Sequence, residues 1–140
     1  MTDKIACAGM LVIREDGNVL LVRTNKGYRW GMPFGKGEPG ETPMETAIRE
    51  TREETGILVT EARQLYSRQL DDGTQAVTYL ALSYHGEATS SAEGYTAWRP
   101  MWFLCGEDGR FRDYNSDLMA VLLKDYLRLS NQEANRDPKE

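Results

Sequence analysis

The side chains best suited to chemistry lie between residues 35 and 57, where the sequence reads GKGEPGETPMETAIRETREETGI. Glu50, Glu53 and Glu54 stand at i, i+3 and i+4, so they share one face if the segment is helical. Like charges at this spacing repel one another and destabilise an isolated helix. Arg49 pairs with neighbouring glutamates, but one arginine does not neutralise three carboxylates. Because Mg²⁺ takes clustered carboxylate oxygens and bridges them to phosphates, the pattern predicts a divalent-metal site.

A helix must hold these glutamates in place, and local signals mark both of its ends. Thr42, Pro43 and Glu45 form a capping-box pattern, with threonine at the N-cap, proline at the first helical position and glutamate three residues after the cap. Gly56 is suited to end the helix in the left-handed conformation. We therefore expect a helix over residues 43–55. Its predicted core face carries Met44, Ala47, Ile48, Thr51 and Thr55.

The remaining sequence alternates between β-rich runs and turn signals. Strands are expected over 4–14 and 18–23, joined as a hairpin through Glu15-Asp16-Gly17, and then over 57–60, 65–70, 75–84 and 97–104. Residues 25–41 are expected to be a loop without regular structure, 86–94 a second loop, and 116–129 a second helix. This order predicts an α+β fold, an α/β/α sandwich with a mixed sheet packed between helices. One domain over 1–130 is expected, with a polar tail over 131–140.

Composition narrows the classes of partner. The chain of 140 residues has a formal net charge of -5, which argues against a surface for duplex nucleic acid. Cys7 and Cys105 are too few and too far apart for a disulfide framework or a zinc site. The stretch IACAGMLVI (5–13) is expected to be a strand rather than a signal peptide, and no apolar run reaches membrane-spanning length. We expect a cytoplasmic protein without a membrane partner.

The glutamate-rich segment resembles the sequence box of the Nudix hydrolase family. The pattern is G-x5-E-x7-R-E-x-x-E-E-x-G followed by an aliphatic residue, and it is matched by Gly35, Glu41, Arg49, Glu50, Glu53, Glu54, Gly56 and Ile57. One departure is Thr51, where the family usually has an aliphatic residue. Since Thr51 lies on the core-facing stripe, we expect this departure to affect packing rather than chemistry.

The resemblance implies roles for these residues. In Nudix enzymes the glutamates at the positions of Glu53 and Glu54 bind divalent metal, and the one at Glu50 binds metal or activates water. The position of Gly35 gives a backbone carbonyl to a metal. Arg49 matches the arginine that orients the glutamates, and the position of Glu41 supports the loop and helix. The implied cofactor is Mg²⁺, with Mn²⁺ as a substitute.

Many relatives recruit another glutamate from a later loop. Glu93 is the candidate here and Glu87 the second, although either is more often a plain surface charge. Which of Glu50, Glu53 and Glu93 is the general base stays open. The lone histidine, His85, is expected at a strand end, in a surface role.

Substrate contacts are expected outside the box. Arg23 and Lys36 are candidates for phosphate oxygens, with solvated charge as the alternative. Tyr28 and Trp30 are candidates for stacking on a base, or for closing the edge of the domain. Asn115 lies where MutT-like relatives place a base-reading amide, and a helix cap is the competing role.

The resemblance implies a Mg²⁺-dependent pyrophosphohydrolase of the MutT-like type. The expected substrate is a nucleoside triphosphate or dNTP, cleaved in a house-cleaning role, or a dinucleoside polyphosphate. The segments 39–41 and 45–51 resemble the dinucleoside polyphosphate branch, whereas Phe34 replaces the lysine usual there. The alternatives are a nucleotide sensor of the same fold without turnover, or a structural acidic domain that binds no metal. The expected partner is a small-molecule nucleotide, and a homodimer is left open.

Overall fold

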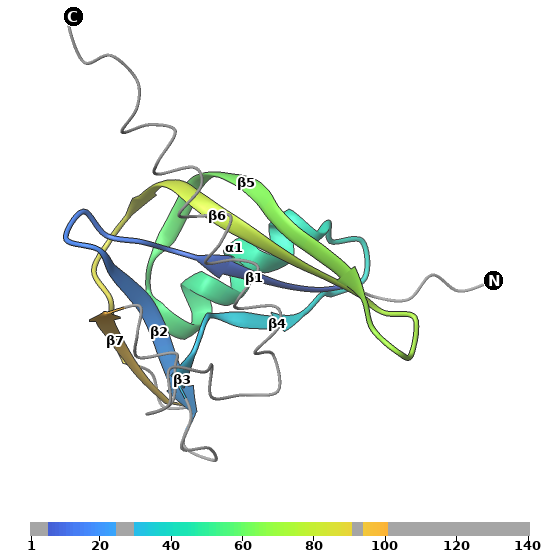
Figure 1. Ribbon diagram of the computed structural model, residues 1–140, viewed down its shortest axis with the longest axis horizontal. Coiled ribbons are helices and arrows are strands. Elements are labelled where there is room, and N and C mark those ends of the chain that lie inside the picture. The colour runs from blue at the N-terminus through green and yellow to red at the C-terminus, as the bar shows by residue number, and fades with distance from the viewer. Residues whose placement is uncertain (1–5, 25–29, 91–93, 101–140) are drawn as a thin grey trace, which may run out of the picture. The chain divides into compact units, whose positions relative to one another are not determined.

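The computed structural model describes residues 6–24, 30–90 and 94–100, which form two β-sheets and one helix (Figure 1). The elements are β1 (Cys7–Leu11), β2 (Asn18–Thr24), β3 (Trp30–Gly31), β4 (Phe34–Lys36), α1 (Pro43–Thr55), β5 (Leu58–Gln69), β6 (Gln75–His85) and β7 (Gly94–Pro100). One sheet has the order β4-β1-β6-β5 and the other β3-β2-β7. The helix predicted over 116–129, the tail over 131–140 and the end of the strand predicted over 97–104 lie outside the described residues.

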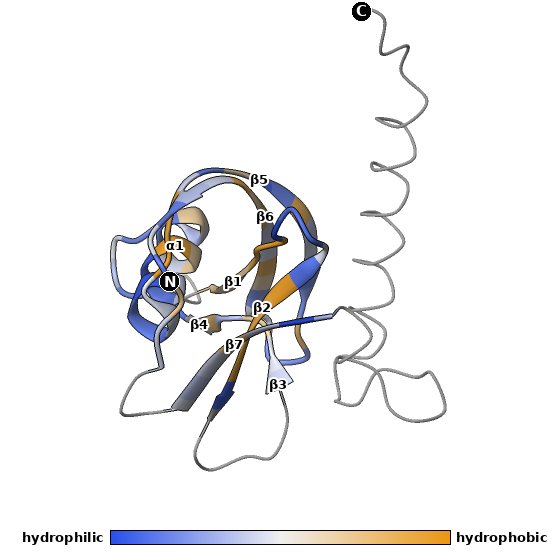
Figure 2. Cartoon of the chain, turned by 90° about the vertical axis from the view of Figure 1, so that its left-hand side faces the viewer, coloured by the Kyte–Doolittle hydropathy of each residue, from blue (hydrophilic) through white to orange (hydrophobic). Residues whose placement is uncertain are grey.

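The four-stranded sheet is mixed, as the sequence predicts. β1 runs parallel to β6, with Cys7 opposite Ala76, and antiparallel to β4, with Cys7 also opposite Lys36. α1 packs against β1 and contacts β4, β5 and β6 (Figure 1). The apolar core between them consists of Ala8, Met10, Val12, Leu20, Ala47, Ile57, Val59, Val77 and Tyr79. Figure 2 shows the hydrophobic stretches of β1 and β2 that take part in burying this core.

α1 begins and ends at the predicted residues. The Thr42 hydroxyl accepts a hydrogen bond from the Glu45 amide at 3.1 Å, and the Glu45 carboxylate accepts one from the Thr42 amide at 2.8 Å. Gly56 follows the helix with φ of 82°, and its amide donates to the Arg52 carbonyl at 2.9 Å. These contacts satisfy backbone groups that a helix end leaves without partners. The predicted core stripe is confirmed, with Thr51 fully buried.

The predicted hairpin through residues 15–17 forms only locally, and two other predictions about this part of the fold are wrong. An antiparallel bridge joins Ile13 to Val19, and backbone hydrogen bonds run from Arg14 to Asn18 at 2.8 Å and from Leu20 to Val12 at 3.0 Å, whereas β1 and β2 themselves belong to different sheets. Residues 57–60 and 65–70 are parts of one long strand, β5, whose register shifts against β6 mark irregular points. The predicted loop over 25–41 contains β3 and β4. Their partner strands are distant in sequence, and the glycines and prolines of this stretch hide them from local prediction.

Within the described part of the chain, no helix is long and apolar enough to cross a membrane. The DDGT sequence at 71–74 forms the turn between β5 and β6. Its Gly73 has φ of 89°, and the Thr74 amide donates to the Asp72 carboxylate at 2.8 Å. The turn is thus set by local residues, in contrast to β3 and β4.

Candidate functional site

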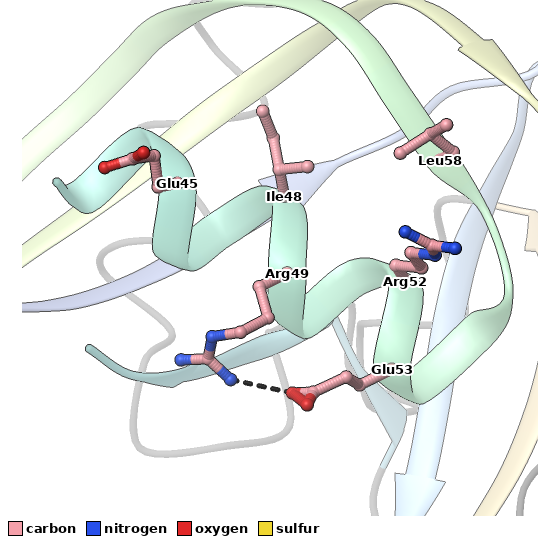
Figure 3. Close-up of a pocket in the computed structure, with 6 residues that line it drawn as sticks. All are labelled: Glu45, Ile48, Arg49, Arg52, Glu53 and Leu58. Atoms are coloured by element: carbon pink, nitrogen blue, oxygen red, sulfur yellow. Dashed lines mark hydrogen bonds and ion pairs between the residues drawn. The ribbon is translucent and has the colours of Figure 1, made fainter. Parts of the chain in front are cut away.

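Arg49 is the centre of the glutamate cluster on α1. Its Nε donates to Glu41 Oε2 at 2.7 Å, and its Nη1 donates both to Glu50 Oε1 at 3.0 Å and to Glu53 Oε1 at 2.7 Å. Its Nη2 reaches the backbone carbonyl of Lys36 at 3.0 Å. Figure 3 shows Arg49 and Glu53 pointing toward one another from successive turns of the helix. One guanidinium therefore joins the helix, the preceding loop and the end of β4.

Glu41 is the most strongly held carboxylate in this network. The side chain is only 14 % exposed, and it accepts hydrogen bonds from the Thr46 hydroxyl at 2.7 Å and from the Glu38 amide at 3.0 Å. The hydrogen bonds from Arg49, followed by those from Thr46 and Glu38, lower the pKa of Glu41 to about 2. The same contact with Glu41 raises the pKa of Arg49, so the pair stays ionised. Sequence reasoning missed Thr46, whose hydroxyl is buried on this carboxylate.

The backbone of β4 lies close to the side chain of Glu50. A Cβ atom on Gly35 would lie 2.1 Å from the carboxyl carbon of Glu50, so only glycine permits this approach. The neighbouring Phe34 amide donates to Glu54 Oε1 at 3.2 Å. Glu50 and Glu54 thus lie beside the strand that carries Gly35, as the predicted use of the Gly35 carbonyl requires.

The donor chemistry of this cluster fits a hard divalent ion. Carboxylate and carbonyl oxygens are the ligands that Mg²⁺ and Mn²⁺ prefer, and Glu50, Glu53, Glu54 and the Gly35 carbonyl supply them. Within residues 6–24, 30–90 and 94–100, no three Asp, Glu, His or Cys side chains form one ready-made metal group. The reason lies in the contacts above, because Glu50 and Glu53 share Arg49 while Glu54 reaches toward β4.

A shallow pocket of about 580 Å³ lies beside this cluster (Figure 3). It is lined by Glu45, Ile48, Arg49, Arg52, Glu53 and Leu58, of which Ile48 and Leu58 are apolar. Glu53 lies at its edge and is 56 % exposed, more than Glu50 at 20 %. Glu53 is therefore the carboxylate of the cluster that solvent and solutes reach most readily.

The candidate substrate residues fall in several places. Arg23 in β2 lies opposite Trp30 in β3, with the guanidinium carbon 5.9 Å from the indole ring centre. The Lys36 side chain is exposed at the end of β4. Glu87 is exposed, and so is His85, at the end of β6 as predicted. The predictions for Tyr28, Glu93 and Asn115 fall outside the described residues.

Comparison with known proteins identifies the protein family to which the chain belongs. The model of the NUDIX domain matches residues 3–120, most of the chain, and the chain therefore belongs to the Nudix family. The predicted family is thus confirmed, and members of this family, pyrophosphohydrolases among them, are enzymes that generally use divalent metal ions.

Individual relatives agree with this assignment. The Nudix hydrolase YvcI of Bacillus subtilis is 35 % identical over 96 residues, covering 62 % of this chain and 61 % of YvcI. The asymmetrical bis(5'-nucleosyl)-tetraphosphatase of Mus musculus is 53 % identical over 47 residues, covering 33 % of this chain and 30 % of the mouse protein. The chain thus matches less than two thirds of either relative's length.

A solved structure supports the predicted fold class. It comes from work on MutT of Aliivibrio salmonicida and Vibrio cholerae, and it matches with a TM-score of 0.72 at 23 % identity, covering 87 % of this chain and 99 % of the MutT chain. At this identity the match shows the fold alone. The predicted α+β Nudix fold with a mixed sheet is confirmed.

Proposed function

We propose that this protein is a metal-dependent Nudix pyrophosphohydrolase that cleaves a phosphoanhydride in a nucleotide. The proposed substrate is a nucleoside triphosphate or dNTP, or a dinucleoside polyphosphate. The observation that carries the proposal is the network in which Arg49 holds Glu41, Glu50 and Glu53 together beside Gly35. The ion pairs of the partly buried Arg49 would also stabilise a purely structural acidic surface, so the feature that favours a metal site is the close approach of the Gly35 backbone to these carboxylates.

The reaction requires water to attack phosphorus while the bridging P–O bond breaks. When bound, a divalent ion supplies Lewis-acid polarisation of the phosphoanhydride and of the attacking water. Glu53 and Glu54 with the Gly35 carbonyl are proposed to hold Mg²⁺, for which Mn²⁺ substitutes. One carboxylate among Glu50, Glu53 and Glu93 accepts the proton of the attacking water. Arg49 orients Glu50 and Glu53 through the hydrogen bonds described above.

Glu93 is proposed as a further catalytic glutamate, supported by the contacts on either side of its loop. The Thr89 amide donates to the Thr55 carbonyl at 2.8 Å, and the Thr96 hydroxyl donates to the Glu54 carbonyl at 3.0 Å. The chain is therefore fastened to the last turn of α1 both before and after residues 91–93. Glu87 remains the second candidate for this role.

The substrate class is supported by relatives and by residues outside the box. The mouse relative acts on a bis(5'-nucleosyl) tetraphosphate by name, which supports the dinucleoside polyphosphate option. Arg23 and Lys36 are proposed to meet phosphate oxygens. Tyr28 and Trp30 are proposed to stack on a base, and Asn115 to read it.

The test is a substrate panel in Mg²⁺ or Mn²⁺, with dNTPs, NTPs, diadenosine tetraphosphate, ADP-ribose and NADH, followed by product chromatography. We expect at least one nucleotide to be cleaved at its pyrophosphate. Glu53→Gln should lower kcat by about 10²-fold or more, because a positioned carboxylate is lost while its size is kept. Glu61→Gln, at an exposed position on β5, is the matched control.

Circular dichroism should show the same fold for both variants. Near-normal turnover by Glu53→Gln would remove that glutamate from the mechanism. An absence of turnover with every compound of the panel, in either metal, would contradict the hydrolase assignment.

A further inference from the structure

Thr46, near the start of α1, is a polar residue that is only 1 % exposed. Its hydroxyl donates to Glu41 Oε1 at 2.7 Å and also lies 3.1 Å from the Thr42 carbonyl. A threonine hydroxyl has one proton to donate, and the charged carboxylate is both the nearer and the stronger acceptor. Thr46 therefore bonds mainly to the side chain of Glu41, which lies before the helix in the sequence.

Two other buried threonines of α1 provide a comparison. The Thr51 hydroxyl donates to the Ala47 carbonyl at 2.7 Å, and the Thr55 hydroxyl donates to the Thr51 carbonyl at 2.6 Å. Both bonds run back to the residue four positions earlier, which is a common local partner for threonine inside a helix. These two hydroxyls thus bond within the helix backbone, whereas the Thr46 hydroxyl reaches a carboxylate of the arginine network.

Glu41 connects Thr46 to Arg49. Arg49 Nε donates to Glu41 Oε2 at 2.7 Å and Arg49 Nη2 donates to Oε1 at 3.0 Å, so the two side chains form a bidentate pair. Oε1 is the oxygen that also accepts the Thr46 hydroxyl. Because a bidentate pair keeps its two planar groups aligned, a hydroxyl that fixes the carboxylate also fixes the guanidinium.

The position of this guanidinium matters for an ion at the glutamate cluster. Arg49 Nη1 donates to Glu50 at 3.0 Å and to Glu53 at 2.7 Å, and an ion that binds these carboxylates must displace it. The bonds from Arg49 to Glu41 and to the Lys36 carbonyl do not involve those two carboxylates. They therefore hold Arg49 in place when Nη1 is displaced, which limits its competition with the ion.

We propose that Thr46 is a positioning residue for the metal site, which acts on the ligands of the ion through Glu41 and Arg49. The inference rests on the proposed function for the existence of that site, and it adds a residue that touches neither ion nor substrate. Without the hydroxyl, the Glu41 carboxylate rotates more freely and holds Arg49 less firmly. The guanidinium then follows Glu53 and competes more strongly with the ion. Groups that are hydrogen-bonded behind the ligands of a metal commonly change its affinity.

Calorimetric titration with Mn²⁺ alone tests the inference. Thr46→Val keeps the shape of the side chain and removes the hydroxyl, so the Kd for Mn²⁺ should rise about tenfold. Thr46→Ser keeps the hydroxyl and should bind Mn²⁺ like the original chain. Thr51→Val is the matched control, because it removes from the same helix a buried hydroxyl that bonds to a backbone carbonyl. It should lower stability without changing the Kd for Mn²⁺.

Two further measurements separate positioning from a loss of stability. In a chain that already carries Glu41→Gln, adding Thr46→Val should change the Kd for Mn²⁺ little, because the charged group that transmits the effect is gone. Urea unfolding shows whether each variant is folded under the conditions of the titration. If Thr46→Val is not folded, Thr46→Ala takes its place, since alanine also lacks the hydroxyl and has a higher helix propensity.

Turnover distinguishes this inference from the hydrolase proposal. With whichever nucleotide is cleaved, Thr46→Val should raise the Mn²⁺ concentration needed for half the maximal rate about tenfold, with KM for the nucleotide unchanged. An effect of Thr46→Val on Mn²⁺ binding without any turnover would support the positioning role and contradict only the hydrolase proposal. Mn²⁺ binding that is unaffected by Thr46→Val, weakened equally by Thr51→Val, or absent from the original chain would overturn the positioning role.

Discussion

Arg49 shows how a single side chain makes a dense cluster of negative charge compatible with folding. Its guanidinium uses three nitrogens to reach Glu41, Glu50, Glu53 and the Lys36 carbonyl. From the sequence we expected a metal ion to offset the repulsion among these glutamates. In the structure, Arg49 offsets part of that repulsion. A divalent ion that takes Glu50 and Glu53 as ligands must replace two of these hydrogen bonds, so metal binding and the arginine network are coupled.

The Glu41–Arg49 pair predicts how stability depends on acidity. The pKa of Glu41 falls from 4.5 to about 2 in the folded protein, mainly through Arg49, so the carboxylate stabilises the fold fully above pH 4.5. That contribution is lost as the pH falls from 4.5 toward 2. Glu41→Gln should therefore be less stable than the original chain at pH 6, and the gap should narrow as the pH falls to 3.

Urea unfolding at pH 6, 5, 4 and 3 measures this gap through the midpoint of the transition. Glu61→Gln, on the exposed side of β5, is the control and should show no such narrowing. A gap between Glu41→Gln and the original chain that stays constant over this range would show that the carboxylate is not held by Arg49.

At the scale of elements, what could be predicted depended on where the determining signals lie. α1 was predicted to the residue because Thr42, Glu45 and Gly56 lie next to the helix ends they fix. The candidate site glutamates could be predicted for the same reason, because the box pattern that contains them is a local one. β3 and β4 were missed, because their strand partners, β2 and β1, supply hydrogen bonds that no local pattern in residues 25–41 encodes. β5 was divided in two because its irregular points interrupt the alternation of polar and apolar residues.

The contact between Gly56 and Thr89 at the C-terminal end of α1 can be tested for its contribution to stability. Gly56 has φ of 82°, and a Cβ atom there would lie 2.8 Å from the Thr89 hydroxyl. Gly56→Ala should thus lose about 1–2 kcal/mol of unfolding free energy from the left-handed conformation, and more from this contact. Gly17→Ala is the matched control, because Gly17 has φ of 88° and nothing within 4 Å.

Thermal and urea unfolding compare the two glycine variants. We expect Gly56→Ala to be the less stable, and the added change Thr89→Ala to restore part of the difference. Equal losses in Gly56→Ala and Gly17→Ala would mean that the 86–90 segment moves aside freely and does not hold the helix end.

Within residues 6–24, 30–90 and 94–100, the two sheets are joined partly through the glutamate-bearing helix α1. The Glu54 side chain accepts from Phe34 in β4, while its backbone carbonyl accepts from Thr96 in β7. The candidate metal ligands could be predicted from the sequence because they lie within one short segment. The row of Arg23, Trp30 and Tyr95 could not, because these residues come together only when three strands pair.

Metal binding should stabilise the whole fold, because the ion binds carboxylates that α1 positions only in the folded chain. At an ion concentration 100 times Kd, the expected gain is about 2.7 kcal/mol of unfolding free energy. In a chain of net charge -5 a divalent cation also relieves repulsion, so NaCl at matched ionic strength must serve as the reference. Glu53→Gln and Glu54→Gln should lose most of the gain, whereas Glu61→Gln should keep it. Differential scanning fluorimetry in EDTA, Mg²⁺ and Mn²⁺ measures the shift, and equal melting temperatures in all three would exclude a metal site built on these glutamates.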